Sequence, residues 1–166
     1  MLRKKNNSKF TEIVEQENTK NLENFFSKNK EKTIKDVLNE KKDSFVEGDL
    51  KNFGLYIRDK AKSKRMFQNE VAYKAGLSVR YGEKVFGGGT HPKRDTVLRL
   101  AFTMGLTLIE TNRALRYANR QALYPKYERD AALIKLISDN KNITVEKVNE
   151  ELIENGLEPL AACSEL

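Results

Sequence analysis

Residues 67–88 read FQNEVAYKAGLSVRYGEKVFGG, and this pattern predicts two short helices joined by a tight turn. Helices that cross at a steep angle need a small residue where they approach and a permissive residue at the turn. Ala72 and Gly76 meet these two needs, and Leu77 is placed to fill the space between the helices. Ser78 is a good cap for the second helix. The stretch is typical of a helix-turn-helix.

The rest of the chain predicts an all-α protein. No run of alternating β-branched residues indicates a strand, and the three prolines lie where helices begin or segments end. Apolar residues at helical spacing predict helices at 19–28, 31–42, 49–63, 67–75, 78–86 and 92–104, with a further helix beginning at Thr107.

A weak internal repeat follows the motif. The segment RDTVL at 94–98 recurs as RDAAL at 129–133, and LTL at 106–108 recurs as ITV at 143–145, so the offset grows from 35 to 37 residues. The two extra residues fall in the turn between helices, where insertions are tolerated best. Two docked helical hairpins would give this pattern, and chance similarity between amphipathic helices is the alternative.

Charge is distributed unevenly along the chain. The formal net charge is +7 in total, made up of +1 for residues 1–50, +10 for residues 51–128 and −4 for residues 129–166. A basic segment that contains the helix-turn-helix is what neutralisation of DNA phosphates requires. A solvated, lysine-rich surface is the other explanation of the same charge.

Several protein classes are not favoured by the sequence. No apolar run is long enough to span a bilayer, and polar residues follow the basic N-terminus, so we expect neither a membrane span nor a signal peptide. Cys163 is the only cysteine, so we expect no internal disulfide and a cytoplasmic location. Lone His91 and Cys163 form no metal-binding or nucleophile pattern. We therefore expect no metal, no cofactor and no enzyme.

The motif resembles the XRE, or lambda-repressor-like, helix-turn-helix family. The span from Phe10 to Leu160 is similar to a group of uncharacterised helix-turn-helix proteins common in clostridial bacteria. The residues that carry the resemblance are Gly76-Leu77-Ser78, Tyr81-Gly82, Val85-Phe86-Gly87-Gly88, Pro92-Lys93-Arg94-Asp95, Leu123-Tyr124-Pro125 and Arg129-Asp130.

The resemblance implies roles for individual residues. A Gln that opens the first motif helix contacts phosphate in such repressors, and here it is Gln68. Residues at the start of the second helix reach base edges, which implies Val79 and Arg80, with Lys84 one turn further on. Arginine binds guanine bidentately in the major groove. The other predicted phosphate contacts are Lys74, Thr90, Lys93 and Arg94; the last three flank Gly87-Gly88-Gly89.

Two residues depart from the family pattern. Gly82 replaces the apolar residue that usually buries the second helix, and Glu83 puts a negative charge near the proposed groove face. Tyr81 and Phe86 are large enough to compensate by packing. Because of these departures, a protein-binding module that has lost DNA binding stays an open alternative.

These expectations combine into one hypothesis. The fold is an all-α, lambda-repressor-like helix-turn-helix bundle, with an N-terminal helical extension (1–48), a DNA-binding domain (49–123) and a C-terminal helical hairpin (124–166). The function is that of a transcriptional regulator that inserts helix 78–86 into the major groove of double-stranded DNA, with a homodimer on palindromic sites. The alternative is a helical adaptor that binds a protein partner.

Overall fold

The computed structural model describes residues 24, 27–28, 31–36, 50–139 and 142–163. By its contacts the chain divides into two compact units, Met1–Val46 and Glu47–Leu166. Of the helix predicted at 19–28 only residues 24, 27 and 28 are described, and they are helical. Of the helix predicted at 31–42, residues 34–36 are helical, residues 31–33 are not, and 37–42 lie outside the described residues. Within the described ranges all regular structure is helical, which confirms the prediction of an all-α chain.

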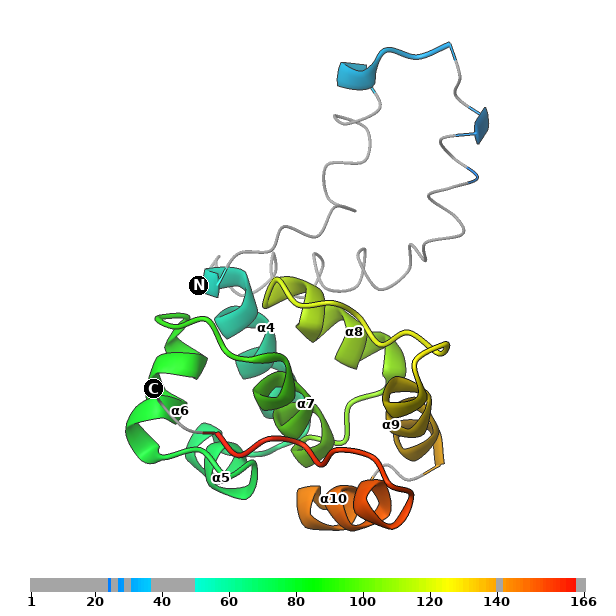
Figure 1. The fold of residues 1–166 in the computed structure, drawn as a ribbon. Coiled ribbons are helices and arrows are strands. Elements are labelled where there is room, and N and C mark those ends of the chain that lie inside the picture. The colour runs from blue at the N-terminus through cyan, green and yellow to red at the C-terminus, as the bar shows by residue number, and fades with distance from the viewer. Residues whose placement is uncertain (1–23, 25–26, 29–30, 37–49, 140–141, 164–166) are drawn as a thin grey trace. The chain divides into compact units, whose positions relative to one another are not determined.

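The second unit is a bundle of short helices (Figure 1). The helices are α4 (Leu50–Ser63), α5 (Gln68–Lys74), α6 (Val79–Gly87), α7 (Arg94–Thr103), α8 (Leu108–Tyr117), α9 (Glu128–Asp139) and α10 (Val145–Glu154). The ends of α4, α5 and α6 differ from the predicted ends by no more than one residue.

Helix α4 supports both α6 and α8. Phe53, Ile57 and Ala61 follow one another at four-residue spacing and are almost completely buried, as expected for the inner stripe of an amphipathic helix. On the side of α4 that meets the end of α6, Gly54 leaves no room for a side chain. A Cβ there would lie 2.8 Å from the backbone nitrogen of Gly88.

A buried ion pair joins α4 to α8. The Lys60 ammonium lies 2.9 Å from the Glu110 carboxylate, and the Tyr56 hydroxyl donates to the Glu110 carbonyl at 3.2 Å. Glu110 also completes the capping box of α8, because its carboxylate accepts from the Thr107 N–H at 2.9 Å. Burial on its own raises the pKa of Glu110, but the hydrogen bonds from Thr107 and Lys60 outweigh it and hold the pKa below its usual value.

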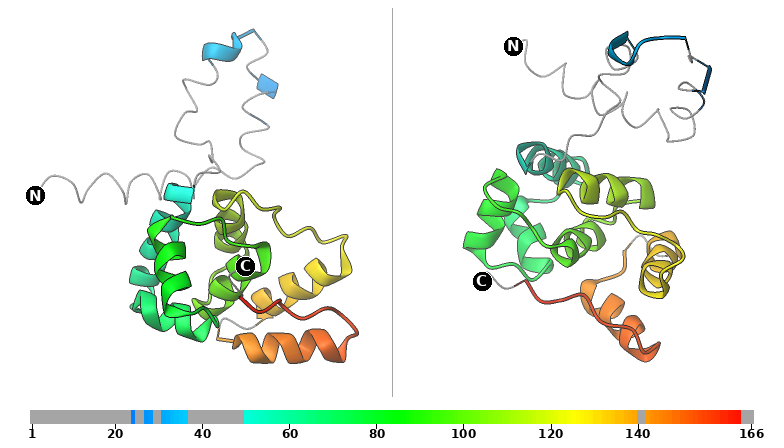
Figure 2. Two further views of the ribbon diagram at one scale, coloured as in Figure 1. Left: turned by 60° about the vertical axis from the view of Figure 1, so that its left-hand side comes forward. Right: turned by 45° about the horizontal axis from the view of Figure 1, so that its top comes forward.

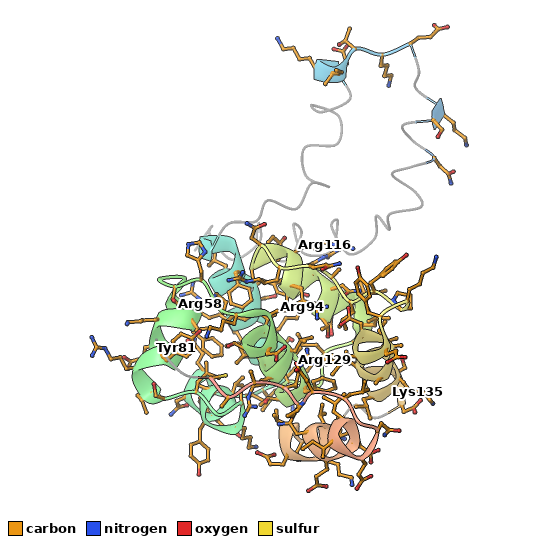
Figure 3. All side chains as sticks on the ribbon, viewed as in Figure 1. Arg58, Tyr81, Arg94, Arg116, Arg129 and Lys135 are labelled. Carbon is orange, nitrogen blue, oxygen red and sulfur yellow. The ribbon has the colours of Figure 1, made fainter. Side chains whose placement is uncertain are left out.

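Two helical hairpins, α7–α8 and α9–α10, dock through crossed arginine–aspartate pairs. Figure 3 labels the two arginines, Arg94 and Arg129. Arg94 of the first hairpin binds Asp130 of the second with two hydrogen bonds of 3.0 and 2.8 Å. Arg129 of the second hairpin binds Asp95 of the first in the same way, at 3.1 and 2.9 Å. The Arg-Asp dipeptide repeated in the sequence therefore forms both halves of one reciprocal joint.

The repeat extends beyond these pairs. The Asn112 side chain accepts from the Leu123 N–H at 2.9 Å, and the Asn149 side chain accepts from the Leu160 N–H at 2.8 Å. Both members of this second bond lie 37 residues after those of the first, the offset found in the sequence. The similarity of the two hairpins is therefore structural and not a chance likeness of amphipathic helices.

After α10 the chain turns back past α7 toward α5 and α6 (Figure 2). Arg99 of α7 holds this returning segment, residues 157–163, to the end of α5. Its guanidinium donates to the Ala75 carbonyl at 2.7 Å and to the Leu160 carbonyl at 3.1 Å. One side chain thus connects the α5–α6 pair with the C-terminal hairpin.

Candidate nucleic-acid interface

The α5–α6 pair is shaped by its turn residues. Helix α5 ends at Lys74 with Ala75 as its C-cap, and Gly76 follows with φ +79°, in the left-handed region that favours glycine. Leu77 is buried between the two helices. The Ser78 hydroxyl caps α6 by accepting from the Tyr81 N–H at 3.2 Å. The roles predicted for Gly76, Leu77 and Ser78 are all confirmed.

At Gly82, α6 lies close to α5. It is buried, and a Cβ at this position would lie 2.7 Å from the Cβ of Ala72. In this chain a small residue is therefore required at position 82, and Gly82 is not a defect in the contact between the helices. Tyr81 and Phe86 are buried on either side of it, as the sequence predicted.

The opposite face of α6 is exposed and carries the predicted base-contacting residues. Val79 is 77% exposed, and Arg80, Glu83 and Lys84 are exposed as well. Within the described part of the chain, neither Arg80 nor Glu83 has a hydrogen-bond or ion-pair partner. The outward face of α6 therefore presents an apolar group, a guanidinium and a carboxylate to solvent.

The predicted phosphate contacts do not all have free side chains. Gln68 is exposed at the first position of α5, and Lys93 is exposed at the N-cap of α7. Thr90 is half-buried in the loop between α6 and α7. Lys74 is exposed but lies 2.7 Å from the Glu70 carboxylate. Through this hydrogen bond and its charge, Lys74 lowers the pKa of Glu70.

Arg94 differs from the other four residues because its guanidinium is already engaged. Besides its two bonds to Asp130 it donates to the carbonyls of Gln121 at 3.0 Å and Ala122 at 3.4 Å. Asp130 is buried, so release of Arg94 to bind a phosphate would leave a buried carboxylate without its cation. The structure gives Arg94 a part in the joint between the hairpins.

The glycine run after α6 contains glycines of two kinds. Gly88 ends the helix with φ +73° and packs against Gly54, so the fold requires it. Gly87 and Gly89 have no positive φ. A Cβ at Gly87 would meet nothing within 4 Å, and a Cβ at Gly89 would make only ordinary contact with the Lys84 carbonyl at 3.7 Å.

The sequence analysis missed a groove between α5 and α6. Its volume is about 350 Å³, and three exposed apolar side chains line it: Phe67, Tyr73 and Val79 are each more than three-quarters exposed. Gln68 and Glu83 lie at the same groove. The sequence did offer one signal: these three apolar residues are not among those predicted to pack between the two helices.

The remaining features noted in the sequence are His91, Cys163 and the expectation of no metal site and no membrane span. His91 is exposed in the loop before α7. The Cys163 thiol lies 3.6 Å from the Thr96 hydroxyl in the returning C-terminal segment. The described residues contain no group of three or more metal-binding side chains, and none of their helices is long and apolar enough to cross a membrane.

Comparison of the chain with family models, with curated proteins and with solved structures finds no match.

Proposed function

We propose that the protein is a sequence-specific, DNA-binding transcriptional regulator, and that α5 and α6 form a helix-turn-helix of the lambda-repressor-like type. In this proposal α6 enters the major groove and α5 lies across the phosphate backbone. Residues 49–123 are the DNA-binding domain and residues 124–166 the hairpin that supports it. A cytoplasmic homodimer would place two copies of α6 on successive half-sites.

The observation that carries the proposal is the division of α6 into two faces. Tyr81, Val85 and Phe86 fix one face in the core, while Arg80 on the other is exposed and has no partner within the described residues. The major groove, about 12 Å wide, admits a helix with such side chains. An unpaired guanidinium near the start of the helix suits bidentate recognition of guanine, which contributes about 1–3 kcal/mol of discrimination.

Phosphate anchoring would come from the residues around this face. Gln68 and Lys93 are exposed at the ends of α5 and α7, and their side chains have no partner within the described part of the chain. To bind a phosphate, Lys74 would have to give up its ion pair with Glu70. The loss of free energy would be small, because ion pairs exposed to solvent contribute little to stability. We leave Arg94 out of this set because Asp130 holds it. The +10 charge of residues 51–128 favours the same partner.

The test is the salt dependence of binding to duplex DNA. A mixed-sequence duplex and a genomic pool are titrated with the full chain at several salt concentrations, and bound genomic fragments are sequenced. We expect strong salt dependence together with enrichment of one sequence. Absence of binding to any duplex at low salt would overturn the proposal.

Two variants separate base recognition from phosphate binding. Arg80→Ala is expected to lose about 1–3 kcal/mol on the enriched sequence and little on unrelated DNA. Lys93→Ala is expected to weaken binding to all sequences alike and to reduce the salt slope by about one. Lys135→Ala is a matched control, because Lys135 is exposed on α9 and pairs with Asp139.

The groove between α5 and α6 favours a second candidate, a helical adaptor without DNA binding. Exposed apolar side chains that surround a groove are characteristic of protein-interaction sites, and Phe67, Tyr73 and Val79 are such side chains. If no duplex binds, this candidate predicts that Tyr73→Ala abolishes capture of a protein partner while the fold stays intact.

A further inference from the structure

The outward face of α6 carries a line of three residues, Val79, Glu83 and Gly87, and the first two border the groove between α5 and α6. They follow one another at four-residue spacing, so they lie on one side of the helix, one turn apart. All three are exposed. Arg80 and Lys84 form a parallel line beside them at the same spacing. Glu83 lies midway along the length of this line, so a partner that covers the line meets its carboxylate.

No hydrogen bond or ion pair within the described residues accounts for a carboxylate at Glu83, although Lys84 and Arg80 are near neighbours in sequence. An ionised carboxylate only accepts hydrogen bonds. Close to DNA it must either find a donor or be repelled by the phosphates.

Gly87 continues the same line, and neither its backbone conformation nor its described neighbours require a glycine there. Its φ is not positive, and a Cβ added to it would meet nothing within 4 Å. Glycine is also among the least favourable residues in a helix. Glycine at such a position is suited to close approach of a backbone from outside the chain. The end of α6 thus carries no side chain on this side of the helix.

We propose that Glu83 is a specificity-determining residue that accepts a hydrogen bond from the N4 amino group of a cytosine, while Gly87 lets the DNA approach the end of α6. This inference rests on the proposed function. Cytosine is favoured because its amino group is the only polar group it presents in the major groove, whereas adenine places an acceptor, N7, beside its amino group. Glu83 therefore selects a C·G pair and rejects sites where its carboxylate stays unpaired.

The test of Glu83 uses the enriched duplex and its single-base-pair variants with wild-type protein, Glu83→Gln and Glu83→Ala. Wild type is expected to lose about tenfold in affinity when one particular C·G pair is replaced. Glu83→Ala is expected to lose the preference at that pair alone. Glu83→Gln is expected to shift it toward A·T, because glutamine binds adenine bidentately. Glu154→Gln, an exposed change in α10, is the control.

The outcomes are distinct. If both Glu83 variants bind every duplex more tightly by the same factor, Glu83 only repels phosphates, and the inference is overturned while the proposed function stands. The same holds if the base preference is unchanged at every position. If wild type binds no duplex at all, the proposed function fails, and this inference fails with it.

Gly87→Ala tests the second half of the inference independently. The melting temperature is expected to stay the same or to rise, because the added Cβ has free space and alanine favours the helix. Affinity for every duplex is expected to fall by about fivefold or more, since the methyl group occupies the space the DNA backbone needs. Unchanged affinity in a folded variant would contradict the role of Gly87.

Discussion

Gly54 sets how closely α4 and the end of α6 approach each other. A Cβ at this position would lie 2.8 Å from the Gly88 nitrogen and 2.9 Å from the Phe86 carbonyl oxygen. Both are backbone atoms, so neither can rotate away as a flexible side chain would. The position of α6, and with it the direction of its exposed face, depends on this glycine.

We therefore expect Gly54→Ala to destabilise the protein by about 1–3 kcal/mol, the usual cost of overpacking a well-packed contact. The measurement is the free energy of unfolding from urea titration. Gly87→Ala is the matched control, because it makes the same chemical change where a Cβ meets nothing. Equal unfolding midpoints for the two variants would show that the contact at Gly54 is not tight.

At this scale the sequence predicted some glycines and missed others. Gly76 was recognised because a turn between two helices needs a left-handed residue at a fixed place. The roles of Gly54 and Gly82 were not recognised, because a glycine inside a helix has the same local pattern whether or not another helix crosses there. Only the position of the facing backbone or side chain separates the two cases.

The two hairpins are joined by α7 and α9, and each of these helices supplies one arginine and one aspartate to the joint. Asp130 is buried, and Arg94 is its cation. Asp95 also accepts from the Ala161 N–H at 2.9 Å, and Asp130 accepts from the Tyr124 N–H at 2.9 Å. The joint therefore holds the segments after α8 and α10 as well as the helices themselves.

A double-mutant cycle measures this joint. Arg94→Gln and Asp130→Asn are each expected to cost about 3 kcal/mol, because each leaves a largely buried partner uncompensated. The double variant is expected to cost clearly less than the sum, with a coupling of about 1–3 kcal/mol. Additive losses in the free energy of unfolding would mean that the two side chains do not stabilise each other.

The same joint makes stability depend on pH. Burial on its own raises the pKa of Asp95, but the hydrogen bonds from Arg129 and from the Ala161 N–H outweigh it, so the pKa lies below its usual value. A carboxyl with a depressed folded-state pKa contributes stability above its unfolded pKa of about 3.9. That contribution is lost as pH falls through the folded-state pKa.

We accordingly expect the melting temperature of the wild type to fall as pH drops below about 4, and Asp95→Asn to be less stable at pH 7 with a shallower acid dependence. Asp59→Asn, an exposed change in α4, serves as the control. If the melting temperatures of wild type and Asp95→Asn changed with pH in parallel, Asp95 would not be a source of the acid sensitivity. Glu110, whose pKa is also lowered, adds to the acid sensitivity of both proteins.

At the scale of the whole second unit, Arg99 contacts two segments that lie far apart in the sequence. It binds a carbonyl after α5, that of Ala75, and another after α10, that of Leu160. We therefore expect the stability of the α5–α6 pair and that of the C-terminal hairpin to be coupled through this residue.

Arg99→Gln is expected to lower the free energy of unfolding by about 1.5–3 kcal/mol, the contribution typical of hydrogen bonds to charged groups. Amide hydrogen exchange should increase at residues 75–77 and 160–161 together. Arg116→Gln is the control, because Arg116 is exposed on α8. Faster exchange at only one of the two segments would show that they are not coupled through Arg99.

The sequence by itself determined the helical class, the ends of the α5–α6 pair and the repeat of the C-terminal hairpins. These depend on local patterns: apolar periodicity, a capping serine and a glycine at a left-handed turn. Tertiary structure alone decided that Arg94 binds Asp130 rather than standing free, that Gly54 and Gly82 are contact points, and that apolar residues line a groove beside α6. The physical reason is that hydrogen bonding, close approach and exposure depend on atoms brought together from distant parts of the chain.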